Sequence, residues 1–94
     1  MKIKFTFKAK QEFSNSAKFY ESRKSGLGKR FTKQIRKEVE FIQNNPKAAE
    51  LKYKDIRVLV VKTFPFTIHY KIEDHYIVIV AIFHSHRNPE KLNR

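Results

Sequence analysis

The sequence predicts an α+β domain in which a helical hairpin packs on one face of a small, mostly antiparallel sheet, in the order β-α-α-β-β-β. Residues 66–73 alternate apolar with polar side chains, and residues 76–83 are apolar throughout, which is typical of a half-buried strand beside a central one. Between residues 9 and 44, apolar side chains recur instead at helical spacing. The first pattern indicates the strands of the sheet, and the second indicates the helices that pack on it.

The chain is expected to begin with a strand and a helix. Residues 2–8 alternate apolar residues with lysine and threonine, so this strand should bury one face and leave its lysines in solvent. Residues 9–24 are predicted to form a helix with one apolar stripe. The apolar positions are Ile3, Phe5 and Phe7 in the strand, and Phe13, Ala17 and Tyr20 in the helix.

A second helix should follow almost at once. Ser25-Gly26 ends the first helix, because glycine suits the left-handed position after a helix C-terminus. The second helix should end at Asn44-Asn45-Pro46, since the residue before proline is pushed out of helical geometry. Two helices joined by so short a link pack as an antiparallel hairpin. The second helical stripe consists of Leu27, Phe31, Ile35, Val39 and Ile42.

The rest of the chain should complete the sheet. Residues 47–55 are a basic, polar connector, and residues 56–63 form a third β-rich run that ends before Pro65. A two-residue loop at Asp74-His75 sets the register of the last two strands. The helix-facing pairs are then Phe66 with Phe83, Ile68 with Ala81, Tyr70 with Ile79, and Ile72 with Ile77. The other face pairs Thr67 with Ile82, His69 with Val80, Lys71 with Val78, and Glu73 with Tyr76, with His84 in the same parity.

Composition narrows the class of protein. Residues 1–94 are expected to form a single domain, and 40% hydrophobic residues with nine Phe and four Tyr argue against disorder. No apolar run approaches the roughly 20 residues of a membrane span, and no signal peptide is indicated at the start. The lack of cysteine excludes disulfides and fits a cytoplasmic protein. The net charge of +12 indicates a polyanionic target or an acidic protein partner.

No metal or cofactor is expected. His84 and His86 lie two residues apart, but no third ligand stands at a familiar spacing and there is no cysteine. The sequence also lacks a glycine-rich phosphate loop, a nucleophile elbow and a pair of catalytic carboxylates.

A distributed basic set is the remaining candidate for chemistry. In a meander, the start of one strand and the end of another can meet at one end of the sheet. Such a site could bind RNA phosphates and cut RNA without metal, with a histidine or lysine moving a proton and an arginine stabilising charge. Spacing alone favours a plainer alternative, in which Arg57 and Arg87 pair with nearby carboxylates and the lysines are solvated. The set comprises Lys52, Tyr53, Lys54 and Arg57, together with His84, His86 and Arg87.

The chain resembles the ParE/RelE superfamily of toxins from type II toxin–antitoxin systems. The element order, the link Gly26-Leu27-Gly28, the helix stop at Asn45-Pro46 and Arg57 at the start of a strand carry the resemblance. The segments FPFTIHY (64–70) and HSHRNP (84–89) complete it and favour the ParE-like branch. The resemblance implies a small basic toxin that a cognate antitoxin neutralises.

Three functions follow from this resemblance. A ParE-like toxin would bind and inhibit DNA gyrase, whereas a RelE-like toxin would be a ribosome-dependent mRNA endonuclease. An inactive member would only bind antitoxin. We expect target or RNA contacts at Lys52, Tyr53, Lys54, Arg57 and Arg87, with Arg57, His84, His86 and Arg87 catalytic only in an endonuclease. An acidic antitoxin segment is expected on the sheet face opposite the helices, at Lys71, Val78, Val80 and Ile82.

Overall fold

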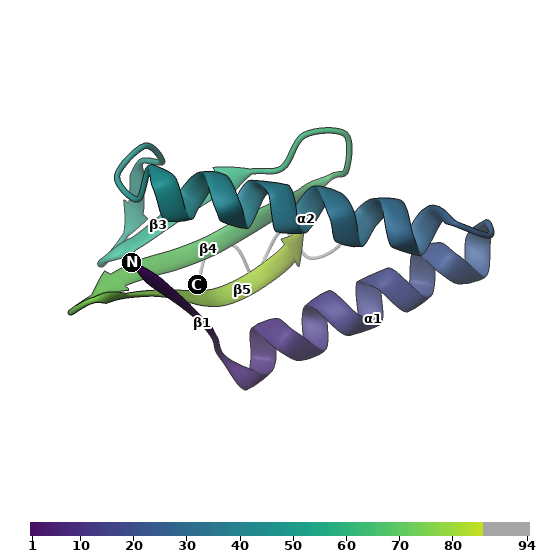
Figure 1. Cartoon of the computed structure of the whole chain (residues 1–94), viewed down its shortest axis with the longest axis horizontal. Coiled ribbons are helices and arrows are strands. Elements are labelled where there is room, and N and C mark those ends of the chain that lie inside the picture. Colours follow the sequence, from purple (N-terminus) through teal and green to yellow (C-terminus); the bar gives the residue numbers. More distant parts are fainter. Residues whose placement is uncertain (86–94) are drawn as a thin grey trace.

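The computed structural model describes residues 1–85 and shows two helices packed on a five-stranded mixed sheet (Figure 1). The strand order is β1-β5-β4-β3-β2, with β1 parallel to β5 and the other neighbours antiparallel. The predicted α+β class is therefore confirmed. The elements are β1 (Lys2–Phe5), α1 (Phe7–Arg23), α2 (Leu27–Asn44), β2 (Leu51–Tyr53), β3 (Ile56–Val60), β4 (Phe66–Glu73) and β5 (Tyr76–His84).

One strand was missed by the sequence interpretation. The segment taken as a connector contains β2, which pairs with β3 at the sheet edge. All three of its residues are exposed, so it lacks the apolar alternation that marks a half-buried strand. Lys54 adopts a left-handed φ of 48° in the turn that returns the chain to β3.

The first strand ends earlier than its alternation predicts. Thr6 leaves the sheet and caps α1, with its Oγ1 accepting a hydrogen bond from the Ala9 amide at 3.1 Å. Phe7 therefore begins the helix and is 76% exposed, so its expected place on the buried strand face is wrong. A capping threonine overrides strand alternation because it satisfies an otherwise unpaired helix amide.

The helix link is built around the carboxylate of Glu21. This carboxylate accepts hydrogen bonds from the amides of Gly26, at 2.9 Å, and Gly28, at 3.0 Å. Gly26 has a left-handed φ of 87°. A side chain at Gly28 would place its Cβ 2.5 Å from the Ala17 carbonyl oxygen, so glycine permits the close approach of the two helices.

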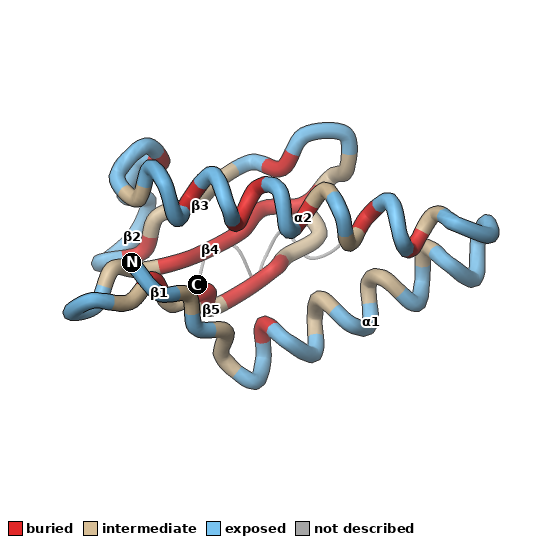
Figure 2. The backbone as a smooth tube through the Cα atoms, in the orientation of Figure 1, coloured by how far each residue is buried: buried red, intermediate tan, exposed pale blue. Residues whose placement is uncertain are grey.

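The core lies between α2 and the facing side of the sheet, where Figure 2 shows the red buried positions. The apolar stripe of α2 at Phe31, Ile35, Val39 and Ile42 is buried, as predicted. Tyr70 is fully buried, and its hydroxyl donates to the Pro46 carbonyl at 2.8 Å, which fixes the chain after α2. The rings of Tyr20, Phe31, Phe64 and Phe66 pack together at one end of the core.

The register of β4 and β5 is as predicted near the hairpin loop and shifts by one residue farther along. Tyr70 pairs with Ile79, whereas His69 pairs with Ala81, so Val80 is an extra residue in β5. Beyond this bulge, each side chain of β5 lies on the sheet face opposite to the predicted one. Ile82 now pairs with Ile68, and His84 pairs with Phe66, both on the helix side. Four predicted pairs are wrong for this reason: Phe66–Phe83, Ile68–Ala81, Thr67–Ile82 and His69–Val80.

The free edge of β5 is covered by the start of α1. β1 pairs with the first half of β5, and within the described residues the second half has no strand neighbour on that side. Thr6 donates through Oγ1 to the Val80 carbonyl at 3.3 Å, and Glu12 Oε1 accepts from the Ile82 amide at 2.9 Å. Side chains thus satisfy edge groups that could otherwise pair with another chain.

Candidate functional site

The sheet face opposite the helices carries a chain of hydrogen bonds centred on His69. His69 Nδ1 lies 2.9 Å from the Tyr53 hydroxyl, and Nε2 lies 2.9 Å from Thr67 Oγ1. Thr67 Oγ1 also contacts the Phe83 carbonyl at 3.5 Å. If Thr67 donates to that carbonyl, it accepts from Nε2–H of His69, and Nδ1 accepts the Tyr53 proton. Tyr53, His69 and Thr67 then each donate in the same direction, and the Phe83 carbonyl is the final acceptor.

His69 is a buried residue in a position that sequence analysis placed on an accessible face. It is only 4% exposed, and the rings of Tyr53 and Phe83 lie against it. Burial lowers the pKa of His69, with an opposing effect from Glu12 and a smaller further lowering from Lys8. The lowered pKa favours neutral imidazole, which donates through one ring nitrogen and accepts through the other. Tyr53, 37% exposed, is the accessible end of this chain, and burial raises its pKa.

Arg57 lies on the other side of the sheet from Tyr53 and His69. It pairs with Tyr70, whose side chain is in the core beneath the helices. Its Nη1 donates to the Ala49 carbonyl at 2.7 Å and to the Lys47 carbonyl at 3.4 Å. The predicted cluster of Arg57 with Tyr53 is thus not brought together. Arg57 instead binds the segment that follows α2. Its hydrogen-bond acceptors are backbone carbonyl oxygens, whereas the plainer alternative expected carboxylates.

The two lysines beside Tyr53 are exposed. Lys52 pairs with Glu50 at 3.3 Å, and this contact is open to solvent. Lys54 occupies the turn after β2. Residues 52–54 therefore form one short basic edge, on the opposite side of the sheet from β1.

His84 faces the helix side, which corrects its expected parity. Its ring lies 5.0 Å from the Phe66 ring, in an edge-on arrangement. The bulge at Val80 is the physical cause, because one extra residue exchanges the faces of every later side chain. The predicted site residues His86 and Arg87 lie outside the described residues.

The predicted antitoxin contacts divide between two faces. Val78 and Val80 are half-buried, and Lys71 bonds Glu73 at 3.0 Å, a contact that raises the pKa of Lys71. Ile82 is 2% exposed and belongs to the core cluster, so its expected place on the outer face is wrong. Only Lys71, Val78 and Val80 remain accessible to a partner.

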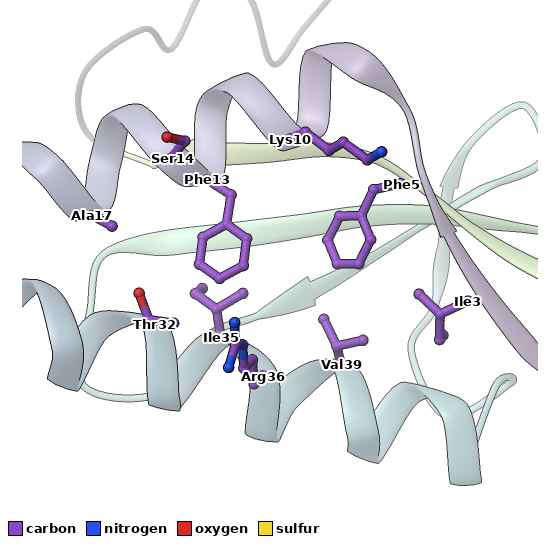
Figure 3. Close-up of a pocket in the computed structure, with 10 residues that line it drawn as sticks. All are labelled: Ile3, Phe5, Lys10, Phe13, Ser14, Ala17, Thr32, Ile35, Arg36 and Val39. Carbon is purple, nitrogen blue, oxygen red and sulfur yellow. The ribbon is translucent and has the colours of Figure 1, made fainter.

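A large apolar groove separates the two helices at their open end, with a volume of about 500 Å³ (Figure 3). Figure 3 shows Phe13 and Ile35 pointing toward one another from the facing helices, with Phe5 and Val39 beside them. Lys10 and Arg36 stand on opposite helices at its rim. Sequence analysis missed this groove, since it assigned the same apolar positions to a closed helical hairpin. We call it the hairpin groove.

Within residues 1–85, no group of three or more side chains could hold a metal ion. In the same part of the chain, neither helix is long and apolar enough to cross a membrane.

Comparison with known families identifies the fold. A sequence model of the family described as ParE toxin of type II toxin-antitoxin system, parDE, matches residues 3–89. The chain belongs to the ParE toxin family. A ParE toxin is one half of a toxin–antitoxin pair, so an antitoxin partner is implied.

A solved structure agrees with the fold of this ParE-family chain. It is described as the chromosomal ParDE TA system from P. aeruginosa, with a TM-score of 0.77 and 21% sequence identity. The match covers 89% of this chain and 95% of the other. A search of curated protein sequences found no match.

Proposed function

We propose that this ParE-family toxin arrests growth by binding and inhibiting DNA gyrase in the cytoplasm, and that a cognate antitoxin neutralises it. Family membership over residues 3–89 carries the proposal. The described surfaces support a binding protein over a nuclease. Arg57 is engaged by backbone carbonyls, His69 is buried, and His84 faces the helix side.

Gyrase inhibition can be tested directly with the purified chain. We expect DNA supercoiling by gyrase to stop in its presence, while mRNA on purified ribosomes stays intact. Arg87→Ala, in the HSHRNP segment, should weaken the inhibition. His75→Ala, in the exposed hairpin loop, is the matched control and should leave inhibition unchanged. Supercoiling at the normal rate with saturating toxin would rule out gyrase as the target and leave the endonuclease or the inactive, antitoxin-binding role.

The hairpin groove is the proposed docking site of the antitoxin. Its apolar walls suit a helix or extended segment with apolar side chains, and Lys10 and Arg36 at the rim suit acidic flanks. The sheet face at Lys71, Val78 and Val80 is proposed as a second contact. Hydrogen exchange of the Val78 and Val80 amides should slow in the complex if the second contact forms.

A filled groove should block the antitoxin without unfolding the toxin. Ser14 lines the groove, and Ser14→Trp would occupy it from the rim. Asn15→Trp is the control, because Asn15 is exposed on α1 and does not line the groove. We expect the Ser14 variant to lose antitoxin binding and keep its thermal unfolding midpoint. Equal antitoxin affinity for both variants would place the antitoxin elsewhere.

The alternative endonuclease function has one supporting observation. The Tyr53 hydroxyl lies 2.9 Å from His69 Nδ1, and Lys52 and Lys54 flank it in sequence, so a phenol with an imidazole partner lies within a basic edge. In an endonuclease, Tyr53→Phe should slow mRNA cleavage on the ribosome by about 10²–10⁴-fold. The same variant should leave gyrase inhibition intact if the toxin acts only by binding.

A further inference from the structure

A second groove lies on the opposite flank of α2 from the hairpin groove. It runs between α2 and residues 61–65, which join β3 to β4, and consists of two adjoining hollows of about 460 and 290 Å³. The hollows share Gln34, Lys37 and Thr63. We call the combined feature the cationic groove, because Arg30, Lys33, Lys37 and Lys62 line it.

Among residues 1–85, the four cations of this groove form no ion pair with a carboxylate. Within residues 1–85, the lysines that form ion pairs are Lys8, Lys52 and Lys71, and none of them lines the groove. Arg30, Lys33 and Lys37 stand three and four residues apart on one helix, where like charges oppose helix formation. These like charges therefore repel one another in the free protein. A ligand of opposite charge would remove the repulsion.

The groove is held in shape by a buried carboxylate. Glu38 is 7% exposed, and its Oε2 accepts hydrogen bonds from the Lys62 amide at 2.9 Å and from Gln34 Nε2 at 3.0 Å. These bonds tie the 61–65 segment to α2. Thr63, next in the chain, has a left-handed φ of 68°, which the tie to α2 helps to maintain. A groove that is already ordered loses little entropy on binding.

We propose that the cationic groove binds the phosphate backbone of DNA without reading its sequence. From Arg30 to Lys37 the helix rises about 10 Å. That length equals about three nucleotides along one strand, at about 3.4 Å each. The phosphates of DNA are regularly spaced, as are the cations on this flank of the helix. An acidic peptide would match these cations only if its carboxylates had the same spacing.

The choice of DNA over RNA rests on the proposed function, because gyrase acts on DNA. The groove also lies on the flank of α2 away from the hairpin groove, so antitoxin in the hairpin groove would leave it open. A toxin bound to gyrase could then contact the DNA that gyrase holds.

DNA binding by the purified chain, without gyrase, tests this inference separately from gyrase inhibition. Binding of a short labelled DNA duplex is measured between about 50 and 200 mM salt. The test variant carries Arg30→Gln, Lys37→Gln and Lys62→Gln. The control carries Lys2→Gln, Lys18→Gln and Lys24→Gln, which remove the same charge at exposed positions outside the groove. Thermal unfolding of both variants checks that they fold.

We expect the groove variant to bind DNA at least about tenfold more weakly than the control. Each lost phosphate contact should also make the slope of log K against log salt shallower by about 0.9. Equal weakening in both variants would show binding by net charge alone and overturn the proposal. Stronger binding to RNA of the same sequence, or to a glutamate-rich peptide of equal charge, would overturn the choice of DNA. Loss of gyrase inhibition with DNA binding intact would leave the inference standing.

Discussion

At the scale of single residues, His69 shows how the fold changes the chemistry that a sequence suggests. Its position in an alternating strand predicts an outward-facing side chain, and the face is as expected. Its burial is not foreseeable from alternation, because it depends on Tyr53 from β2 and Phe83 from β5. Burial lowers the pKa of His69 and so makes neutral imidazole the favoured form.

The lowered pKa of His69 predicts a loss of stability in acid. Below an unfolded-state pKa of about 6.5, the unfolded chain binds a proton that the folded chain resists, so unfolding becomes easier as pH falls. The loss starts near that pH and levels off below the folded-state pKa. Its slope for one proton is at most about 1.4 kcal/mol per pH unit.

Urea unfolding between pH 7.5 and pH 5 measures this effect. The free energy of unfolding of His69→Gln should depend less on pH than that of the natural chain over this interval. The variant lacks the imidazole that gains a proton on unfolding. His75→Gln changes a histidine in an exposed loop and should keep the natural dependence. Parallel curves for all three proteins would show that His69 does not carry the effect.

At the scale of elements, the pairing of β4 with β5 was predicted correctly up to the bulge in β5 and incorrectly beyond it. The hairpin loop and apolar runs predict both strands and their pairing near the loop, and the structure confirms them up to Tyr70 and Ile79. No local signal marks Val80, since every residue from Tyr76 to Phe83 is apolar and either register buries apolar groups. Long-range packing against α1 settles the register, with Ile82 in the core and its amide bonded to Glu12.

Removing the Glu12 carboxylate should expose the edge of β5. Glu12→Ala leaves the part-buried Ile82 amide without its acceptor, which should lower the free energy of unfolding by about 1–3 kcal/mol. Glu12→Gln keeps an acceptor oxygen and should lose less. Urea unfolding gives the stability of each variant, and exchange of the Ile82 amide reports on the bond itself. Unchanged exchange at Ile82 in Glu12→Ala would contradict the assigned role.

At the scale of the whole molecule, the sequence predicts a layered fold but not the spaces at its surface. The apolar patterns of helices and strands predict which side chains turn inward, and Phe31, Ile35 and Ile79 are fully buried. They do not give the angle between α1 and α2, so the hairpin groove had no sequence signal. The candidate site likewise depends on how the strands pair. Arg57 was expected beside Tyr53 but lies on the other face of the sheet.

A pair of neighbouring valine and isoleucine substitutions tests the layered arrangement. Ile79→Ala removes a fully buried side chain under the helices and should lower the free energy of unfolding by about 2–5 kcal/mol. Val78→Ala changes the next residue, which is half-buried on the other face, and should cost less. Equal losses in chemical denaturation would show that the two faces are packed alike.

The parallel pairing of β1 with β5 has a consequence for synthesis of the chain on the ribosome. Lys2 is aligned with Tyr76, so β1 has to wait until β5 has been made before it finds its neighbour. Contacts between such distant residues form late in folding. At about 5–20 residues per second, translation delays this pairing by several seconds. A nascent chain or a prematurely terminated fragment therefore lacks both the completed sheet and the anchored start of α1. Toxicity should appear only after release of the full-length product.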